Sequence, residues 1–435
     1  MRHLSRLVVS ALLLSLLIGM TACGGDDSSK TVSAGDPSGI KVDIPALPQY
    51  TFSSNTVRVL THDASLAESD IIKTVKELYG LEVKVDIVAA AERVTKLINQ
   101  VMADEAPDVF QYYWAPTLMK NKYVQPIDAY IDFDSDFWRD KRTISDQLKW
   151  EDGKHYITSP SDGTYHFLYF NRSIFEEEDE KTPYELYKEG SWDWNVMEEL
   201  ARKMTHDTNK DGEPEQYGLG MSTPETLLYT TGKHVVTLEN GKVINTVKSP
   251  EIARCFRFVN NMLDEGIVDT NSQEDFLAGK VAMCFGHLYN RLTFKDLSAA
   301  GTLGIAPIPK DPEADKYYIG VDAEGWQLPY KASNPEGYGA FLSAMRYEWF
   351  LEEKDPARKE EAYQLAVKAY NWNETLQKEF EGSQIENKVF GVWQGLGIGD
   401  YWGDVFSRPF AGEPWETIAE EISPLIDKKL EDAYA

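Results

Sequence analysis

The chain has few cysteines: only Cys23, Cys255 and Cys284 occur in 435 residues. Cys255 falls in an apolar helical pattern and Cys284 in an apolar run, so both are expected to be buried, where a free cysteine packs as a small hydrophobe. Two separate thiols are the favoured interpretation, and a disulfide between them is the alternative in an exported protein. No CxxC or HExxH pattern occurs, which argues against a zinc site or a thiol nucleophile.

Basic residues are scarce as well. Lys and Arg number 44 against 71 Asp and Glu, for a formal charge of -27. A potential this negative opposes binding to nucleic acid and to anionic lipid headgroups. The GxSxG elbow, the P-loop and a strand-flanked GxGxxG are also missing. Carboxylate runs such as 176–178 could supply the two catalytic carboxyl groups of a glycosidase. Such runs are typical of solvated helix faces, so no enzymatic activity is expected.

No apolar run is long enough to cross a membrane. The longest, Leu7 to Ile18, has 12 residues, which as a helix span about 18 Å of the roughly 30 Å hydrocarbon core. Arginines precede it, and Thr21-Ala22-Cys23 follows it. This order resembles the signal of bacterial lipoproteins, in which the cysteine is acylated and becomes the new N-terminus.

The N-terminal region is therefore expected to hold the chain at a membrane. Residues 1–22 are predicted to be a signal peptide and Cys23 a lipid anchor on the extracytoplasmic face of the cell membrane. Residues 23–54 are rich in Ser, Gly, Asp and Pro and are predicted to form a flexible tether.

Beyond the tether, strand and helix patterns alternate. Strands are predicted at 56–61, 81–88 and 107–110, with helices at 68–79 and 91–102. This order predicts an α/β fold with a parallel sheet, which binds ligands at the carboxyl ends of its strands. Asp63 follows the first strand, and Tyr112 and Trp114 follow the third. The length of the remaining chain predicts two lobes.

A short acidic segment matches the first half of a calcium loop. Asp207, Asn209 and Asp211 alternate before Gly212, but Gly218 stands where the bidentate Glu is needed. A solvated acidic turn is the favoured interpretation, and a structural calcium ion is the alternative. No other cofactor is expected.

Aromatic residues make up 12% of the chain and include 11 Trp. Sugar rings stack their C–H faces on indole or phenol and offer hydroxyls to carboxylates, amides and imidazoles. Short segments combine both kinds of group: His287 with Tyr289, and Asp322 and Glu324 with Trp326. These segments favour a carbohydrate ligand.

Six motifs occur in an order that resembles a known family. They are Ala106–Val109, Tyr169–Arg172, Trp192–Trp194, Asp207–Gly218, Gly279–Met283 and Leu303–Pro309. Together they resemble the extracellular solute-binding proteins of ATP-binding-cassette importers, the group that includes maltose-binding protein. The likeness covers nearly the whole chain after the signal.

The resemblance implies a two-lobed periplasmic-binding-protein-like fold of type II, whose lobes are joined by hinge crossovers and close on a ligand. It implies a first lobe of 55–162 plus 304–328 and a second of 163–303 plus 329–435. The predicted ligand-binding residues are Asp63, Tyr112, Trp114, Asp162, Tyr165, His287, Tyr289, Asp322, Glu324, Trp326, Trp393 and Trp402.

The function that follows is capture of a carbohydrate, in particular an oligosaccharide, and its delivery to the permease subunits of an importer by a monomeric, membrane-anchored chain. One alternative keeps the fold and changes the ligand to a peptide or a phosphorylated polyol. Another is a surface lipoprotein that holds glycans without a permease.

Overall fold

The computed structural model describes residues 44–158 and 166–434 and divides into two compact units. The first unit comprises Met1–Asp162, Glu239–Lys242 and Ala323–Ala366, and the second comprises Gly163–Leu238, Val243–Asp322 and Val367–Ala435. The signal peptide, Cys23, most of the tether, Asp162 and Tyr165 lie outside the described residues. No helix in the described ranges is long and apolar enough to cross a membrane.

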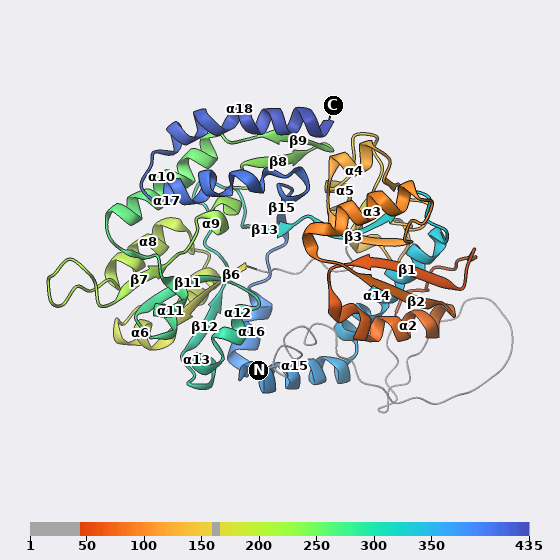
Figure 1. Cartoon of the computed structure of the whole chain (residues 1–435). Helices are drawn as coiled ribbons and strands as arrows, with labels where there is room; N and C mark the ends of the chain where they lie inside the picture. The colour runs from red at the N-terminus through yellow and green to blue at the C-terminus, as the bar shows by residue number, and fades with distance from the viewer. Residues whose placement is uncertain (1–43, 159–165, 435) are drawn as a thin grey trace. The chain divides into compact units, whose positions relative to one another are not determined.

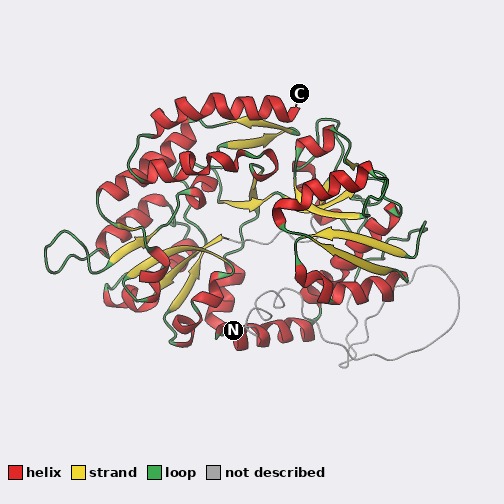
Figure 2. Ribbon diagram, in the orientation of Figure 1, coloured by secondary structure: helices red, strands yellow, loops and turns green. Residues whose placement is uncertain are grey.

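The first unit is built on a mixed sheet flanked by helices (Figures 1 and 2). Its strands are β1 (Thr56–Thr61), β2 (Glu82–Ile87), β3 (Val109–Tyr113), β4 (Val124–Gln125), β5 (Ile157–Thr158) and β14 (Glu324–Pro329). Its helices include α2 (Asp70–Tyr79), α3 (Arg93–Met102), α4 (Pro116–Lys120), α5 (Arg142–Gln147) and α14 (Pro335–Lys354). The path β2-β1-β3 is parallel as predicted, but β14 joins β3 antiparallel.

Amphipathic helices explain the core of this unit. Ile71 and Val75 on α2 are buried in one hydrophobic cluster with Val57 and Val59 of β1. Helix α2 ends at Gly80, whose φ of 71° is the left-handed conformation that favours glycine at a helix C-terminus. Helix α14 packs beside α2 and contributes Phe341 to the same cluster.

The second unit has a five-stranded sheet and two smaller ones. Its strands are β6 (His166–Asn171), β7 (Tyr217–Gly220), β8 (Val236–Glu239), β9 (Lys242–Asn245), β10 (Val268–Asp269), β11 (Val281–His287), β12 (Leu303–Ala306), β13 (Tyr318–Asp322) and β15 (Asn387–Gly391). The large sheet has the order β10-β7-β11-β6-β12, with β6 antiparallel to both neighbours. Strand β13 pairs with β15 in parallel.

Helices surround these strands (Figure 2). They include α6 (Arg172–Glu177), α7 (Pro183–Lys188), α8 (Trp194–Lys203), α9 (Glu225–Thr230), α10 (Pro250–Asp264), α11 (Ser272–Leu277), α12 (Asn290–Thr293), α13 (Lys295–Ala299), α16 (Glu374–Gly382), α17 (Arg408–Phe410) and α18 (Trp415–Tyr434). The hairpin β8–β9 turns at Asn240-Gly241 as its sequence predicts and lies beside α18 (Figure 1), where Asn245 Nδ2 donates to the Ser423 carbonyl over 3.0 Å.

The two units divide the chain differently from the predicted lobes. Residues 304–322 fall in the second unit because β12 pairs with β6 of its sheet and β13 pairs with β15. Residues 329–366 fall in the first unit because α14 packs on α2 and β1. Helix α15 (Pro356–Tyr370) carries the chain across the boundary at 366.

Cys255 and Cys284 are free and buried, which confirms the favoured interpretation of separate core thiols. Burial raises the pKa of the Cys284 thiol to about 12, and the pKa of Cys255 is raised further by the same cause. Neither thiol therefore ionises in neutral solution, and both act as packing residues.

Candidate ligand-binding site

The first unit uses several of its predicted ligand-binding residues for its own structure. Asp63 caps the short helix η1 (Ala64–Glu68): its Oδ1 accepts hydrogen bonds from the Ser65 backbone nitrogen at 2.9 Å and the Ser65 hydroxyl at 2.6 Å. Such a cap satisfies donors that the first turn leaves free. The Asp63 carboxylate is thus committed to local structure.

The indoles of Trp114 and Trp326 are buried inside the first unit. Trp114 is 1% exposed, and its Nε1 donates to the Leu148 carbonyl over 2.8 Å. Trp326 is 7% exposed and packs edge-on against Phe341, with ring centroids 5.4 Å apart. Strand β3 runs on to Tyr113 and pairs with β14, which places Trp326 in the sheet. We leave both out of the proposed site.

Tyr112 stays partly exposed near the carboxyl end of β3. The buried Arg93 guanidinium lies over the rings of Tyr112 and Tyr113, at 4.9 and 5.5 Å from their centroids, and pairs with Glu324 at 2.6 Å. Burial raises the pKa of Tyr112, against the opposing effect of Arg93. Arg93 balances the charge of the Glu324 carboxylate in this ion pair. Glu324 is therefore a weaker candidate for hydrogen bonding to a ligand hydroxyl than the sequence suggests.

The remaining five predicted residues that the structure describes come together in the second unit. With their neighbours they form a group that we call the aromatic–acid cluster. It consists of His166, Glu225, Tyr229, His234, His287, Tyr289, Asp322, Trp393, Gln394 and Trp402.

Strand pairing places one side of the cluster. His287 at the end of β11 lies opposite His166 at the start of β6, and their ring centroids are 4.4 Å apart. Tyr289 stacks on His287 at 5.0 Å with 14° between the planes. The Tyr289 side chain is 61% exposed, which is unusual for so large a ring. This side therefore offers flat ring surfaces to solvent.

The other side follows β15. Trp393 lies 4.2 Å from Trp402, and Trp402 lies 4.2 Å from Phe406 of the π-helical turn η6 (Gly403–Ser407), measured between ring centroids. Both indoles are half-buried. Gln394 opens the turn η4 (Gln394–Leu396), and its Nε2 donates to Asp322 Oδ1 over 2.6 Å. Indole faces and a carboxylate thus lie side by side.

Tyr229 on α9 joins the two sides. Its ring lies 6.2 Å from His166 and stacks on His234 at 4.8 Å, and its hydroxyl donates to Glu225 Oε1 over 3.3 Å. A side-chain carbon on Gly320 would come within 2.2 Å of the Tyr229 ring, so only glycine lets β13 pack against it. A side-chain carbon on Gly391 would lie 2.5 Å from the Tyr229 hydroxyl and 3.4 Å from Trp393 Nε1. The backbone of β15 therefore also lies close to Tyr229.

The cluster contains two acidic side chains, Glu225 and Asp322, and no Lys or Arg. Burial raises the pKa of Glu225 to about 8, and the nearby charge of Asp322 adds to the rise. Burial lowers the pKa of His166 and of His234 to about 3 and lowers that of His287 as well. At neutral pH these imidazoles are therefore uncharged, Glu225 is mostly protonated, and no cluster residue is a cation.

Several polar atoms of the cluster have no partner. Nδ1 of His166, both ring nitrogens of His234 and Oε1 of Gln394 are buried without a hydrogen bond to any residue in 44–158 or 166–434. Burying polar atoms unpaired is costly, so these groups stand out in the cluster.

Sequence reasoning did not identify Glu225, Tyr229 or His166. Glu225 follows a proline in a segment with no motif, and Tyr229 and His166 lie in apolar runs. Their role depends on the contact of α9 with β13, which periodicity does not reveal. The one signal in the sequence was Gly320, because a glycine within a strand, here β13, often marks a close approach of another part of the chain.

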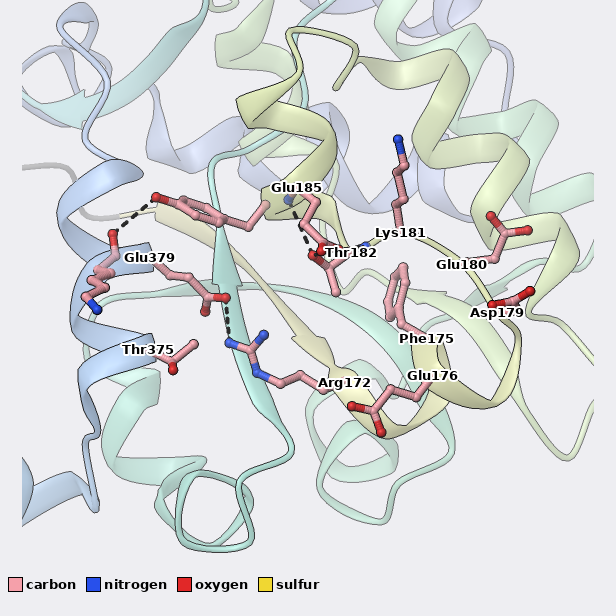
Figure 3. A pocket seen from close by; sticks show the side chains of 12 residues that line it. Arg172, Phe175, Glu176, Asp179, Glu180, Lys181, Thr182, Glu185, Thr375 and Glu379 are labelled. Carbon is pink, nitrogen blue, oxygen red and sulfur yellow. Dashed lines mark hydrogen bonds and ion pairs between the residues drawn. The ribbon is translucent and has the colours of Figure 1, made fainter.

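A hollow of about 740 Å³ lies on the second unit, away from the aromatic–acid cluster (Figure 3). Its lining residues come from α6, α7 and α16, and its central pair is Arg172 with Glu379 at 2.5 Å. Thr182 and Glu185 form the capping box of α7, and Lys181 pairs with Glu189. Phe175 and Tyr184 also line it, but these polar groups pair within the protein, so we do not assign the ligand to this hollow.

The acidic loop at 207–215 uses its oxygens for turns. Asp207 accepts from the backbone nitrogens of Lys210 at 2.6 Å and Gly212 at 3.0 Å, and Asn209 accepts from that of Asp211 at 2.8 Å. In the described parts of the chain no three His, Cys, Asp or Glu side chains are placed to hold a metal ion. The geometry gives the calcium alternative no support.

Comparison with known proteins identifies the family. A model described as bacterial extracellular solute-binding protein matches residues 70–346, so the chain belongs to that family. Members of the family are binding proteins rather than enzymes. This assigns the chain to the class of extracytoplasmic solute receptors with two α/β lobes.

Solved structures agree on the fold. The sugar-binding protein MalE of Xanthomonas citri matches with a TM-score of 0.64 and 16% identity over 87% of this chain and 98% of that one. The substrate-binding protein Lmo0181 of Listeria monocytogenes, solved with cycloalternan, matches with a TM-score of 0.59 and 17% identity over 86% and 99%. The GacH receptor of Streptomyces glaucescens matches with a TM-score of 0.57 and 21% identity over 87% and 98%. No protein with curated annotation matches in sequence.

The raised pKa of Glu225 predicts a pH-dependent cost to stability. The folded chain holds a proton that the unfolded chain, with an ordinary pKa of 4.5, releases, so stability contributed by this group falls as pH rises from 4.5 to about 8. The substitution Glu225→Gln removes this cost. We expect it to raise the free energy of unfolding at pH 9 by about 2–4 kcal/mol more than at pH 5.

Urea unfolding of both chains at the two pH values measures this difference. Glu177→Gln, at an exposed glutamate of α6, is the matched control and should show no pH-dependent gain. An equal effect of Glu225→Gln at pH 5 and pH 9 would contradict the assignment of a protonated Glu225.

Proposed function

We propose that the chain is the lipid-anchored substrate-binding protein of an ATP-binding-cassette importer. It captures an uncharged carbohydrate, in particular an oligosaccharide, on the aromatic–acid cluster and delivers it to a membrane permease. The observation that carries this proposal is the grouping of Tyr289, Trp393 and Trp402 with Glu225 and Asp322 on one unit.

The chemistry of the cluster suits a sugar ring. The half-buried indoles and the exposed Tyr289 phenol offer faces on which C–H groups of a pyranose stack. Gln394, Asp322 and the neutral imidazoles of His166 and His287 offer donors and acceptors for hydroxyls. Ring stacking with few convergent polar groups is typical of small-molecule sites.

A phosphorylated polyol or another anion suits this site less well. Such a ligand needs Arg or Lys for charge pairing, and the cluster contains neither. Arg291, the one candidate cation near Tyr289 in sequence, lies over the Tyr370 ring at 4.4 Å. An anionic ligand would instead meet the carboxylate of Asp322.

The structural neighbours support the same ligand class. Their titles name cycloalternan for Lmo0181, acarbose for GacH and sugar binding for MalE. Sequence identities of 16 to 21% support a shared fold and do not identify a ligand. The argument for this chain's ligand therefore depends on its own aromatic–acid cluster.

Ligand binding is predicted to depend on Trp402 and Tyr289. A panel of maltotriose, mannotriose, cycloalternan and related neutral glycans should contain a sugar that binds and changes tryptophan fluorescence. Trp402→Ala should then weaken binding at least tenfold, about 1.4 kcal/mol, because the stacking face is lost. Calorimetric titration of each variant gives the affinity.

Trp349→Ala is the control, because Trp349 is a half-buried indole on α14 of the first unit and should keep the wild-type affinity. If the whole neutral panel fails to bind while phosphorylated polyols or peptides do, the carbohydrate proposal is wrong. Binding of long glycans with no uptake by cells that carry the chain would favour a glycan-holding surface protein.

The membrane anchor is predicted to be Cys23. With Cys23→Ser the exported chain should leave the membrane fraction and lose labelled palmitate, since the proposed acyl chains are attached at Cys23. Fractionation of cells expressing each form measures this. Retention of the serine variant at the membrane would show that another part of the chain attaches it.

A further inference from the structure

Glu225 is the acidic residue of the cluster that lies deepest. It occupies the first turn of α9, directly after Pro224, and its side chain is 18% exposed. Tyr229 donates to its Oε1 over 3.3 Å, and His234 Nε2 lies 3.9 Å from the same oxygen. No hydrogen bond joins Oε2 to another residue in the ranges 44–158 and 166–434. Within these ranges the only oxygen of Glu225 that accepts a hydrogen bond is therefore Oε1.

We propose that Glu225 is a specificity-determining residue of the sugar site: it is kept as a neutral carboxylic acid that donates a hydrogen bond from Oε2 to a ligand oxygen, so that capture requires its proton. The inference rests on the proposed function, because the acceptor is a hydroxyl or ring oxygen of the bound carbohydrate.

The surroundings keep the acid neutral. The titratable and charged groups around it are Tyr229 on α9, His234 on the following turn, His166 at the start of β6, Asp322 at the end of β13, and the ion pair of Glu251 on α10 with Lys233. Lys233 is already neutralised by Glu251 at 3.0 Å. Burial together with Asp322 holds the pKa of Glu225 near 8.

Two carboxyl groups so close together take different roles. Asp322 is exposed, and its Oδ1 accepts a hydrogen bond from Gln394. Glu225 is less exposed, and ionising it beside Asp322 would place a second negative charge in a low dielectric. A carboxylic acid that donates beside a carboxyl oxygen that accepts matches a hydroxyl that both gives and receives a hydrogen bond.

This arrangement makes binding proton-linked in a range where His166, His234 and Tyr229 do not change charge. The imidazoles are neutral above about pH 3 for His166 and His234, and burial keeps Tyr229 protonated well beyond its ordinary range. If only the protonated form binds, the apparent Kd is divided by the protonated fraction of Glu225, which is about one in eleven at pH 9. Affinity should therefore fall about tenfold from pH 6 to pH 9.

The test is calorimetry of the full chain with maltotriose, mannotriose and cycloalternan as probes, between pH 6 and pH 9.5. For a probe that binds, the wild-type Kd should rise about tenfold by pH 9. The side-chain amide of Glu225→Gln can donate a hydrogen bond but does not ionise. The Kd of this variant should therefore be nearly constant across the range. Glu177→Gln, the exposed control on α6, should follow the wild type.

Infrared difference spectra between pH 6 and pH 10 provide a readout that needs no ligand. In the wild type the protonated-carboxyl band should lose a component with a midpoint near pH 8, and this component should be missing in Glu225→Gln. Partly buried Glu352, whose pKa is raised to about 7 by burial, contributes to the band of both chains. A flat wild-type Kd, or the same component in Glu225→Gln, would overturn this inference and leave the proposed function intact. Loss of binding by a folded Glu225→Gln chain at pH 6 would overturn it as well. Failure of every neutral glycan at every pH would overturn the proposed function itself.

Discussion

The parallel pairing of β13 with β15 is the contact on which the ligand site depends. It sets Asp322 opposite Gly391 and leads the chain directly into Trp393 and Gln394. Two glycines, Gly320 and Gly391, let the backbone of this pair lie against Tyr229. A short two-stranded sheet thereby joins a carboxylate and indole rings to α9, where the second acid lies.

The cluster combines partial burial with an excess of acid. Partial burial keeps the histidines uncharged and Glu225 protonated, while Asp322 remains exposed. The result is a surface of aromatic faces and neutral hydrogen-bonding groups with a single carboxylate among them. Such a surface selects for hydroxyl-rich, uncharged molecules because it offers stacking and hydrogen bonds but no countercharge.

Much of the fold was predictable because local patterns agree with tertiary packing. The alternation at 56–61 and the helical spacing ending at Gly80 correspond to β1 and α2. The aromatic residues after the third strand were harder, since the strand continues beyond Phe110 and its partner β14 comes from a distant part of the chain. Burial of Trp114 and Trp326 follows from that pairing, which periodicity cannot reveal. The two units also differ from the predicted lobes, because β12 and α14 pack against partners distant in the sequence.

The site was predictable in part. His287, Tyr289, Asp322, Trp393 and Trp402 were named from residue chemistry and family likeness, and the structure groups them in one unit. Glu225 and Tyr229 were not, because a glutamate after a proline and a tyrosine in an apolar helix carry no signal until their neighbours are known. Their importance arises from burial beside Asp322, which is a property of the packed unit.

Hydrogen–deuterium exchange of the full chain, with and without a neutral oligosaccharide that binds, tests the central claim most directly. The account predicts that ligand slows exchange in α9 and in the segment from β15 through η6, together with the ends of β11 and β13. Slowed exchange confined to α6, α7 and α16 around the hollow of Figure 3 would contradict it.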